Sequence, residues 1–352
     1  MKNLTMFHGS VVTKPEAFVY DIYGVYILFI GLFGCIENGC VILVFIRSKL
    51  LWTPSNIFVF DLVCSDFLIC TIGFPFLMLS SFYQSWIFDI SGCYVYAFSM
   101  SITGMHSIFI LFVIAVERFN AVFYPLQTVK TVTVKRSIYF VICCWTLGVI
   151  ISIPPLVGWN RYVLEGLQIS CSFDMFDTSW QSKSYIMLLI GTFLLILTAI
   201  IICYVKIFFK VRDQIKEMRI VYTKSFNNLQ RIKESKVERK LIYMGFNVTL
   251  FFVLSWGPYA MVTILALCNV LTEKGSVLIV AIPAYFAKSF TICNPVIYIL
   301  NYPQFKRELY KLLCILKQIP CKKKQSQTTQ NLSTITRHVP SAVQTPPNQV
   351  TA

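Results

Sequence analysis

The chain has 352 residues, of which 56% are hydrophobic and only 13% are charged. A soluble globular domain carries about 25% charged residues, so the composition excludes that class and indicates an integral membrane protein. The formal net charge of +15 would also suit a nucleic-acid-binding protein, but the positions of the charges exclude that alternative.

Seven apolar stretches are each long enough to cross a membrane, because about 20 apolar residues in a helix span the hydrocarbon core. They cover residues 18–46, 54–82, 93–117, 137–157, 184–210, 241–268 and 277–300. We therefore predict an all-α membrane protein, with an extracellular segment 1–17 followed by a seven-transmembrane helix bundle at 18–300.

The Lys and Arg residues are distributed unequally between the two sides of these spans. With the N-terminus outside, the outer side carries only Lys2, Lys14, Arg161, Lys183 and Lys274, and most of the 31 basic residues fall on the inner side. Because positive residues accumulate on the cytosolic side, we predict a multi-pass protein of the cell membrane with its C-terminus in the cytosol. The net charge then reflects topology and not nucleic-acid binding.

Both ends of the chain carry predicted modification sites. Asn3 begins a glycosylation sequon in the extracellular segment. Residues 301–314 predict a short amphipathic helix on the inner membrane face, in which Cys314 is placed for palmitoylation. Residues 315–352 are polar and proline-spotted, so we predict a disordered cytosolic tail.

Lys288 lies in the middle of the seventh apolar stretch. A charged residue at that depth is costly, so it usually faces the bundle interior and has a function. Burial favours the neutral amine, which can form a Schiff base with an aldehyde. The alternative is a lysine whose stem extends to the headgroups.

Further motifs accompany this lysine. Cys93 begins the third span and Cys171 follows the fourth, Glu117-Arg118-Phe119 ends the third, Trp256-Gly257-Pro258-Tyr259 lies in the sixth, and Asn294-Pro295-Val296-Ile297-Tyr298 ends the seventh. In combination they resemble the rhodopsin-like G-protein-coupled receptors (class A) over residues 18–314. A lysine six residues before the Asn-Pro-x-x-Tyr motif resembles the animal opsins within that family.

The resemblance implies a light-activated receptor that carries 11-cis retinal as a protonated Schiff base on Lys288. Photoisomerisation would then drive movement of helix six. The positions that match the family's retinal-binding cleft are Tyr96, Gly104, Phe193, Phe252, Trp256, Tyr259 and Ala284. Each of these alone would also suit ordinary packing.

A protonated Schiff base inside a bundle needs a nearby anion. In the family this counter-ion stands mainly on helix three, where this chain has Tyr96, or in the loop six residues before the second cysteine, where it has Glu165. Some relatives use a position near the top of helix two, where this chain has Leu77. A tyrosine carries no charge near neutral pH. The resemblance therefore implies Glu165 as the counter-ion; otherwise it would be a solvated loop acid.

The resemblance also implies a disulfide and a switch. Cys93 and Cys171 both fall on the oxidising outer side, so we predict that they pair. Arg118 would pair with Glu117 and with an acid on helix six until a G protein binds. The complete set of predicted switch residues is Glu117, Arg118, Glu238, Asp66, Asn294, Pro295 and Tyr298.

The implied partner is a heterotrimeric G protein, with a receptor kinase and an arrestin acting on the Ser and Thr residues of the tail. The sequence contains no hydrolase triad, metal-ligand cluster or phosphate loop, so we predict neither an enzyme nor a metal site. The three histidines are scattered, and His106 is predicted to be a core or polar-network residue.

Two other functions suit the same residues. One is a receptor for a diffusible acidic ligand that pairs with Lys288, and the other is a retinal photoisomerase that does not signal. Tyr96 together with Glu165 resembles bistable opsins. The Tyr302-Pro303-Gln304 triplet differs from the vertebrate visual and rhabdomeric forms, which leads to the hypothesis of a non-vertebrate, cnidarian-like opsin that raises cyclic AMP.

Overall fold

The computed structural model describes residues 4–7, 10–13, 15–222, 229–271 and 277–316. The predicted glycosylation site at Asn3 and the tail from residue 317 onwards lie outside this part of the chain. By their contacts the residues divide into two units, Met1–Leu309 and Tyr310–Ala352. The candidate site analysed below belongs to the first unit.

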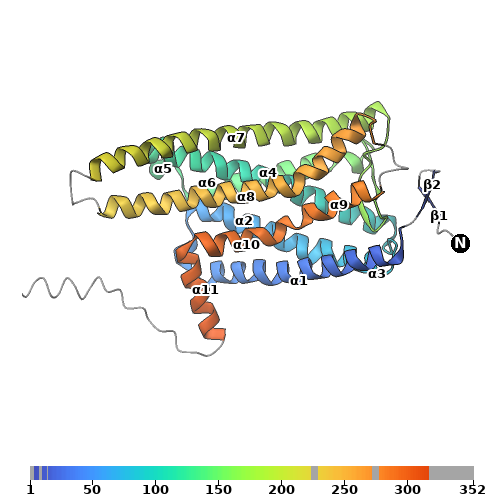
Figure 1. Cartoon of the computed structure of the whole chain (residues 1–352), viewed down its shortest axis with the longest axis horizontal. Coiled ribbons are helices and arrows are strands. Elements are labelled where there is room, and N and C mark those ends of the chain that lie inside the picture. The colour runs from blue at the N-terminus through green and yellow to red at the C-terminus, as the bar shows by residue number, and fades with distance from the viewer. Residues whose placement is uncertain (1–3, 8–9, 14, 223–228, 272–276, 317–352) are drawn as a thin grey trace, which may run out of the picture. The chain divides into compact units, whose positions relative to one another are not determined.

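The described residues include seven helical segments that are long and apolar enough to cross a membrane. They lie side by side (Figure 1), which confirms the predicted bundle. The segments are α1 (Ala17–Arg47), α2 (Pro54–Leu68) continued by α3 (Phe74–Phe82), α4 (Asp89–Phe123), α6 (Val134–Ser152), α7 (Trp180–Tyr222), α8 (Leu229–Leu267), and α9 (Val277–Lys288) continued by α10 (Phe290–Asn301).

Shorter elements connect and extend these helices. They are the antiparallel hairpins β1 (Leu4–Phe7) with β2 (Ser10–Thr13) and β3 (Tyr162–Glu165) with β4 (Ser170–Phe173), the helices α5 (Pro125–Thr131) and α11 (Pro303–Leu316), and the one-turn helices η1 (Lys49–Leu51) and η3 (Pro154–Leu156). The helix α11 corresponds to the amphipathic helix expected at 301–314, and it contains Cys314.

The fifth and sixth transmembrane helices are longer than their apolar stretches. α7 and α8 run side by side past the other helices at the end opposite the β1–β2 hairpin (Figure 1). The sequence places 184–210 in the membrane, so the additional turns of α7 lie in the basic region that follows. α8 likewise begins at Leu229, before the predicted span 241–268. Both helices therefore extend beyond the predicted inner membrane face.

The second transmembrane segment contains a π-helix that the sequence analysis did not predict. This wide turn, η2 (Ile69–Gly73), separates α2 from α3, and Pro75 follows in the first turn of α3. Proline provides no backbone N–H and its ring clashes with the preceding turn. A π-turn relieves that conflict without breaking the span.

Pro295 leaves a carbonyl group without its usual helical donor, and a side chain from α1 satisfies it. Pro295 has no N–H to offer the carbonyl of Thr291, four residues earlier. Asn38 Nδ2 donates to that oxygen at 3.0 Å and to the Gly34 carbonyl at 2.9 Å. Because hydrocarbon offers no hydrogen-bond partner, this contact fixes α1 against α10.

The β3–β4 hairpin is fastened to the bundle by the predicted disulfide. Cys171 in β4 is bonded to Cys93 near the start of α4, with Cα atoms 5.5 Å apart. In the hairpin register Glu165 faces Ser170, and Leu164 faces Cys171. The disulfide therefore fixes the position of Glu165, one residue pair away.

A buried polar cluster connects α2, α4 and α6. His106 Nε2 lies 2.8 Å from Asp61 Oδ2, and Trp145 Nε1 donates to Asp61 Oδ1 at 2.9 Å. The His106 and Trp145 rings stack with centroids 4.1 Å apart, and His106 is completely buried. This is the polar-network position predicted for His106.

We expect Asp61→Ala to destabilise the protein by about 3–5 kcal/mol, because removing one member of a buried pair leaves its partner uncompensated. Thermal unfolding of the purified protein in detergent measures the effect. The control is Asp21→Ala in α1, where the side chain is exposed. Equal melting temperatures for Asp61→Ala and the control would show that the cluster does not stabilise the bundle.

Candidate functional site

A cavity of about 160 Å³ lies inside the bundle, between the transmembrane helices and the β3–β4 hairpin. It is lined by residues from α4, α7, α8, α9 and both hairpin strands. The structure brings together every residue predicted to form the cleft, namely Tyr96, Gly104, Glu165, Phe193, Phe252, Trp256, Tyr259, Ala284 and Lys288.

Lys288 is the last residue of α9, directly before the break that separates this helix from α10. Its Nζ donates to the Ala284 carbonyl at 3.0 Å and lies 5.2 Å from the centre of the Tyr285 ring. Since the lysine side chain lines the cavity, it does not extend to the headgroups. The amine is therefore held by a carbonyl and an aromatic face.

Glu165 ends β3, and its side chain is buried with two hydroxyl donors. Ser170 Oγ donates to Oε1 and Tyr259 Oη donates to Oε2, both at 3.1 Å. Tyr259 in turn lies 2.9 Å from Ser172 Oγ. In the described part of the chain no ion pair joins Glu165 directly to Lys288. The carboxylate is held in the cavity wall and is not a solvated loop acid.

Tyr96 and Gly104 both line the cavity. Tyr96 contributes a hydroxyl group that is available for hydrogen bonding, and Gly104 leaves space. The Tyr96 hydroxyl is buried and has no hydrogen-bond partner among the described residues. At Gly104, an added Cβ atom would meet the Trp256 ring at 3.1 Å. A bound molecule with a polar group could therefore engage Tyr96, and the glycine keeps space beside Trp256.

Aromatic rings form the wall of the cavity on the α8 side. Phe252 and Trp256 have ring centroids 6.0 Å apart, and Phe252 contacts Phe193 at 6.4 Å and Phe290 at 5.1 Å. Pro258 interrupts the hydrogen bonding of α8 one half-turn after Trp256. Apolar rings therefore line this wall beside a helix whose hydrogen bonding Pro258 interrupts.

The predicted switch residues form two separate contacts towards the opposite end of the bundle. Arg118 Nε lies 2.8 Å from Glu117 Oε2, and Ser55 Oγ donates to Glu117 Oε1 at 2.7 Å. Glu238, the predicted second partner, belongs to α8, but its side chain lies outside the described set. Its pairing with Arg118 stays a prediction.

The second contact joins α2 to α10. Asn294 Nδ2 donates to Asp66 Oδ2, and both side chains are completely buried. Within the described structure the Tyr298 hydroxyl is buried without a partner. Pro295 lies between these two residues inside α10. The Asn-Pro-x-x-Tyr motif thus places two polar groups in the core next to a weakened helix.

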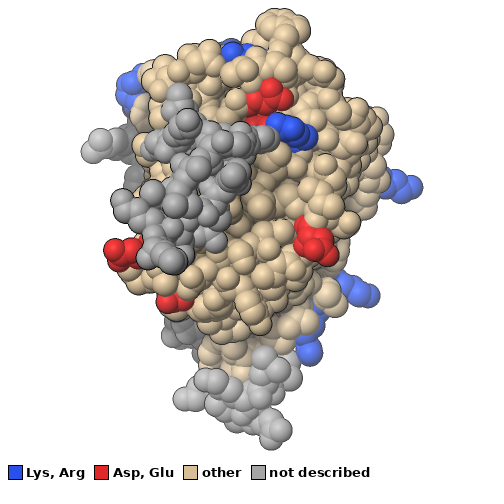
Figure 2. Space-filling model, turned by 90° about the vertical axis from the view of Figure 1, so that its right-hand side faces the viewer, with Lys and Arg blue, Asp and Glu red and all other residues tan. Residues whose placement is uncertain are grey.

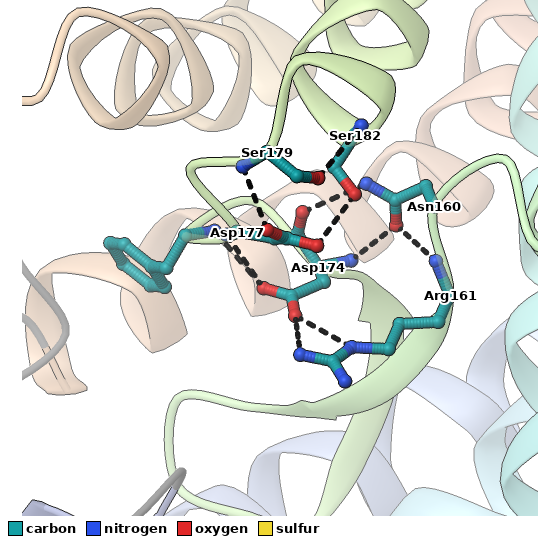
Figure 3. A network of polar contacts seen from close by, with 7 residues as sticks. Asn160, Arg161, Asp174, Asp177, Ser179 and Ser182 are labelled. Atoms are coloured by element: carbon teal, nitrogen blue, oxygen red, sulfur yellow. Dashed lines mark hydrogen bonds and ion pairs between the residues drawn. The ribbon is translucent and has the colours of Figure 1, made fainter.

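The outer loop that carries Glu165 is fixed by a network of polar contacts (Figure 3). Arg161 donates to Asp174 Oδ2 from Nε and from a terminal nitrogen, each at 3.0 Å. Asn160 Oδ1 accepts from the backbone N–H groups of Arg161 and Asp174 at 2.6 and 2.9 Å. These contacts join the two ends of the hairpin.

The same network extends to the start of α7 (Figure 3). Asp177 accepts from the Ser179 backbone N–H at 2.9 Å and from Ser182 Oγ at 2.8 Å. The hydrogen bond from the Ser179 amide is the main cause that lowers the pKa of Asp177.

Tyr162 joins the start of the hairpin to the end of α6. Burial raises the pKa of Tyr162 to about 12, so its hydroxyl stays protonated and donates to the Ser152 carbonyl at 2.8 Å.

The sequence analysis missed the groups that hold Glu165 and Lys288. Ser170, Ser172 and Tyr285 carry no motif, and only the position of the two serines beside Cys171 could have drawn attention to them. Tyr285 lies three residues before Lys288, so it shares the same face of α9.

The comparisons with known proteins agree with this architecture. A family model for the 7 transmembrane receptor (rhodopsin family) matches residues 37–298. The chain is 35% identical to a Gq-coupled rhodopsin of Mizuhopecten yessoensis, over 84% of this chain and 61% of the relative. It is 34% identical to melanopsin-A of Danio rerio, over 88% and 51%.

Two further relatives are cephalopod rhodopsins. The chain is 32% identical to the rhodopsin of Loligo forbesii over 86% of this chain and 68% of the relative. The crystal structure of squid rhodopsin superposes with a TM-score of 0.78 at 29% identity, covering 93% of this chain and 94% of that one. The chain spans about half to two thirds of the length of the curated relatives it matches.

The seven-helix bundle and its internal cavity, together with the matching family model, assign the chain to the rhodopsin-like (class A) receptors. With a lysine in that cavity and rhodopsins and melanopsins among its relatives, the chain belongs to the rhodopsin family of seven-transmembrane receptors, as an animal opsin.

We expect Asp174→Ala to loosen the outer loop, because it removes Oδ2, which accepts from both Arg161 nitrogens, and Oδ1, which accepts from the backbone N–H groups of Phe176 and Asp177. A hydrogen bond to a charged group contributes about 1.5–3 kcal/mol, so amide exchange in the β3–β4 hairpin should accelerate about tenfold or more. Hydrogen exchange with mass spectrometry measures it. The control is Glu16→Ala, whose side chain makes no capping bond; unchanged hairpin exchange in Asp174→Ala would contradict the anchoring role.

Proposed function

We propose that this protein is a light-activated G-protein-coupled receptor that carries retinal covalently on Lys288. The observation that carries the proposal is a lysine amine in an aromatic-walled cavity inside the bundle, with a buried carboxylate in the wall of the same cavity. When bound, retinal would supply light absorption and a change of shape, after its aldehyde condenses with the Lys288 amine and releases water.

The residues present suit such a group. Tyr96 offers a buried hydroxyl that has no partner among the described residues, and a nitrogen at the end of Lys288 could engage it. Gly104 keeps space beside Trp256, and the rings of Phe193 and Phe252 provide an apolar wall. These features match a polyene that is apolar along its length and polar at the attached end.

We assign Glu165 as the counter-ion. A cation buried inside a helix bundle needs an anion, since desolvation otherwise favours the neutral form. Glu165 is the one carboxylate among the residues that line the cavity. Two hydroxyl groups donate to its oxygens, and the disulfide-linked hairpin fixes its position.

Signalling would use the residues towards the inner end of the bundle. Trp256 beside Pro258 would transmit a change in the cavity to α8, and release of Arg118 from Glu117 would create the surface for a heterotrimeric G protein. We place this end in the cytosol of a cell-membrane protein. Figure 2 shows the opposite end, where the few Lys and Arg side chains are scattered.

Several finer points belong to this proposal. The dark state would hold the 11-cis isomer, and the combination of Tyr96 with Glu165 supports a bistable pigment. A receptor kinase and an arrestin would act on the tail beyond residue 316. Glycosylation of Asn3 and palmitoylation of Cys314 are proposed from the sequence alone.

A retinal photoisomerase is the second candidate, since it would use the same cavity. The paired Arg118 and Glu117 and the bonded Asp66 and Asn294 favour the receptor, because isomerisation alone requires neither. A receptor for a diffusible acidic ligand would also require a free Lys288.

The proposal predicts a visible absorption band in purified protein incubated with 11-cis retinal at neutral pH. Lys288→Ala should lose this band completely. Glu165→Gln should move it to the ultraviolet, because the nitrogen loses its proton without a nearby anion. A wild-type spectrum that shows only free retinal would exclude the opsin function and favour a diffusible ligand. A visible band retained in Glu165→Gln would place the counter-ion elsewhere.

The class of G protein can be tested in cells that express the receptor with retinal. The Mizuhopecten relative is named Gq-coupled, whereas the Tyr302-Pro303-Gln304 triplet led to the cyclic AMP hypothesis. We propose Gq coupling, so light should raise cytosolic calcium in wild type and fail to do so in Arg118→Ala, whose visible band should remain. A light-dependent rise in cyclic AMP without calcium would reverse this assignment.

A further inference from the structure

Tyr285 is a fully buried tyrosine that contacts Lys288 without lining the cavity. It is 1% exposed, and its ring lies under Lys288 Nζ at 5.2 Å from the centroid. The Tyr23 ring of α1 packs against it with centroids 4.5 Å apart, and Tyr26 Oη reaches the Tyr285 carbonyl at 3.5 Å. The ring is thereby held in place from α1.

The hydroxyl of the same residue points to the counter-ion. Tyr285 Oη lies 3.4 Å from Ser170 Oγ, and Ser170 Oγ donates to Glu165 Oε1 at 3.1 Å. A continuous path of contacts therefore connects Lys288 with the Tyr285 ring, and the Tyr285 hydroxyl with the Ser170 hydroxyl. The Ser170 hydroxyl completes the path to the Glu165 carboxylate. Lys288 and Glu165, which form no direct pair here, are joined by this path.

We propose that Tyr285 is a positioning residue for the charged nitrogen of Lys288. Its aromatic face attracts the cation, and its hydroxyl, through Ser170, fixes the Glu165 carboxylate in the cavity wall. Tyr285 acts through these two residues, since it does not line the cavity itself. The inference rests on the proposed function, in which that nitrogen carries retinal.

The two actions of Tyr285 can be separated by substitution. Tyr285→Phe keeps the ring and removes the hydroxyl, whereas Tyr285→Leu removes both. Ser170→Ala interrupts the path at its second hydroxyl. Tyr23→Phe is the matched control, because it deletes a hydroxyl from the neighbouring ring while leaving the path intact.

The first measurement is the absorption spectrum with 11-cis retinal at neutral pH. Tyr285→Phe and Ser170→Ala should each displace the visible band and reduce its share relative to the ultraviolet band by roughly threefold or more. The double variant should match Ser170→Ala, because the loss of the Ser170 hydroxyl already disconnects the Tyr285 hydroxyl from Glu165. The control should match wild type. Single variants identical to wild type, or fully additive effects, would overturn the inference.

The second measurement uses protein without retinal. A small acylating reagent reacts with the neutral amine, so loss of the ring should accelerate acylation of Lys288 by roughly three- to tenfold in Tyr285→Leu, while Tyr285→Phe stays near wild type. Peptide mass spectrometry quantifies this one lysine. Equal acylation of Lys288 in Tyr285→Leu and wild type would overturn the role of the ring.

These outcomes separate the inference from the function on which it rests. A wild-type protein without a visible band defeats the proposed opsin function. A normal wild-type band that Tyr285→Phe and Ser170→Ala leave unchanged defeats only the role of Tyr285. Should Tyr285→Leu fail to fold, the spectra of Tyr285→Phe and Ser170→Ala still decide whether the Tyr285 hydroxyl positions Glu165.

Discussion

The cost of placing a lysine amine inside a membrane bundle determines much of the structure around it. Even lenient scales assign about 2.5–3.5 kcal/mol to a lysine at the centre of a membrane helix. The Ala284 carbonyl, the Tyr285 ring and the Glu165 carboxylate in the cavity wall offset that cost. A lysine that destabilises a membrane helix to this extent therefore indicates a functional site.

The outer loop extends this arrangement beyond the helices. Glu165 comes from a short hairpin, which would be marginally stable alone. The disulfide to α4 and the contacts of Asp174 with Arg161 hold it over the cavity (Figure 3). The carboxylate is thus carried by a segment outside the transmembrane helices and fixed in the wall of the cavity that also contains the lysine.

The sequence predicts the bundle well and the site only partly. Uninterrupted apolar stretches determine helices in hydrocarbon, because each backbone group must bond within its own segment. The π-turn at Ile69–Gly73 escaped prediction, since a proline inside a span specifies a disturbance and not its form. Motifs identified Lys288 and Glu165, but Tyr285 became visible only through its distances to Lys288 and Ser170.

The seventh transmembrane segment connects the cavity around Lys288 with the polar contact between Asp66 and Asn294. α9 ends at Lys288, and α10 begins two residues later and contains Asn294 and Pro295. A regular helix would resist bending between these two sites. This segment is interrupted beside Lys288 and lacks a backbone hydrogen bond at Pro295, so it can bend at a lower free-energy cost. Asn38 stabilises the freed carbonyl of Thr291, and Asp66 binds Asn294. A displacement of Lys288 can therefore be transmitted along α10 to the buried contact between Asn294 and Asp66. The side-chain contacts along this segment can break and form one at a time.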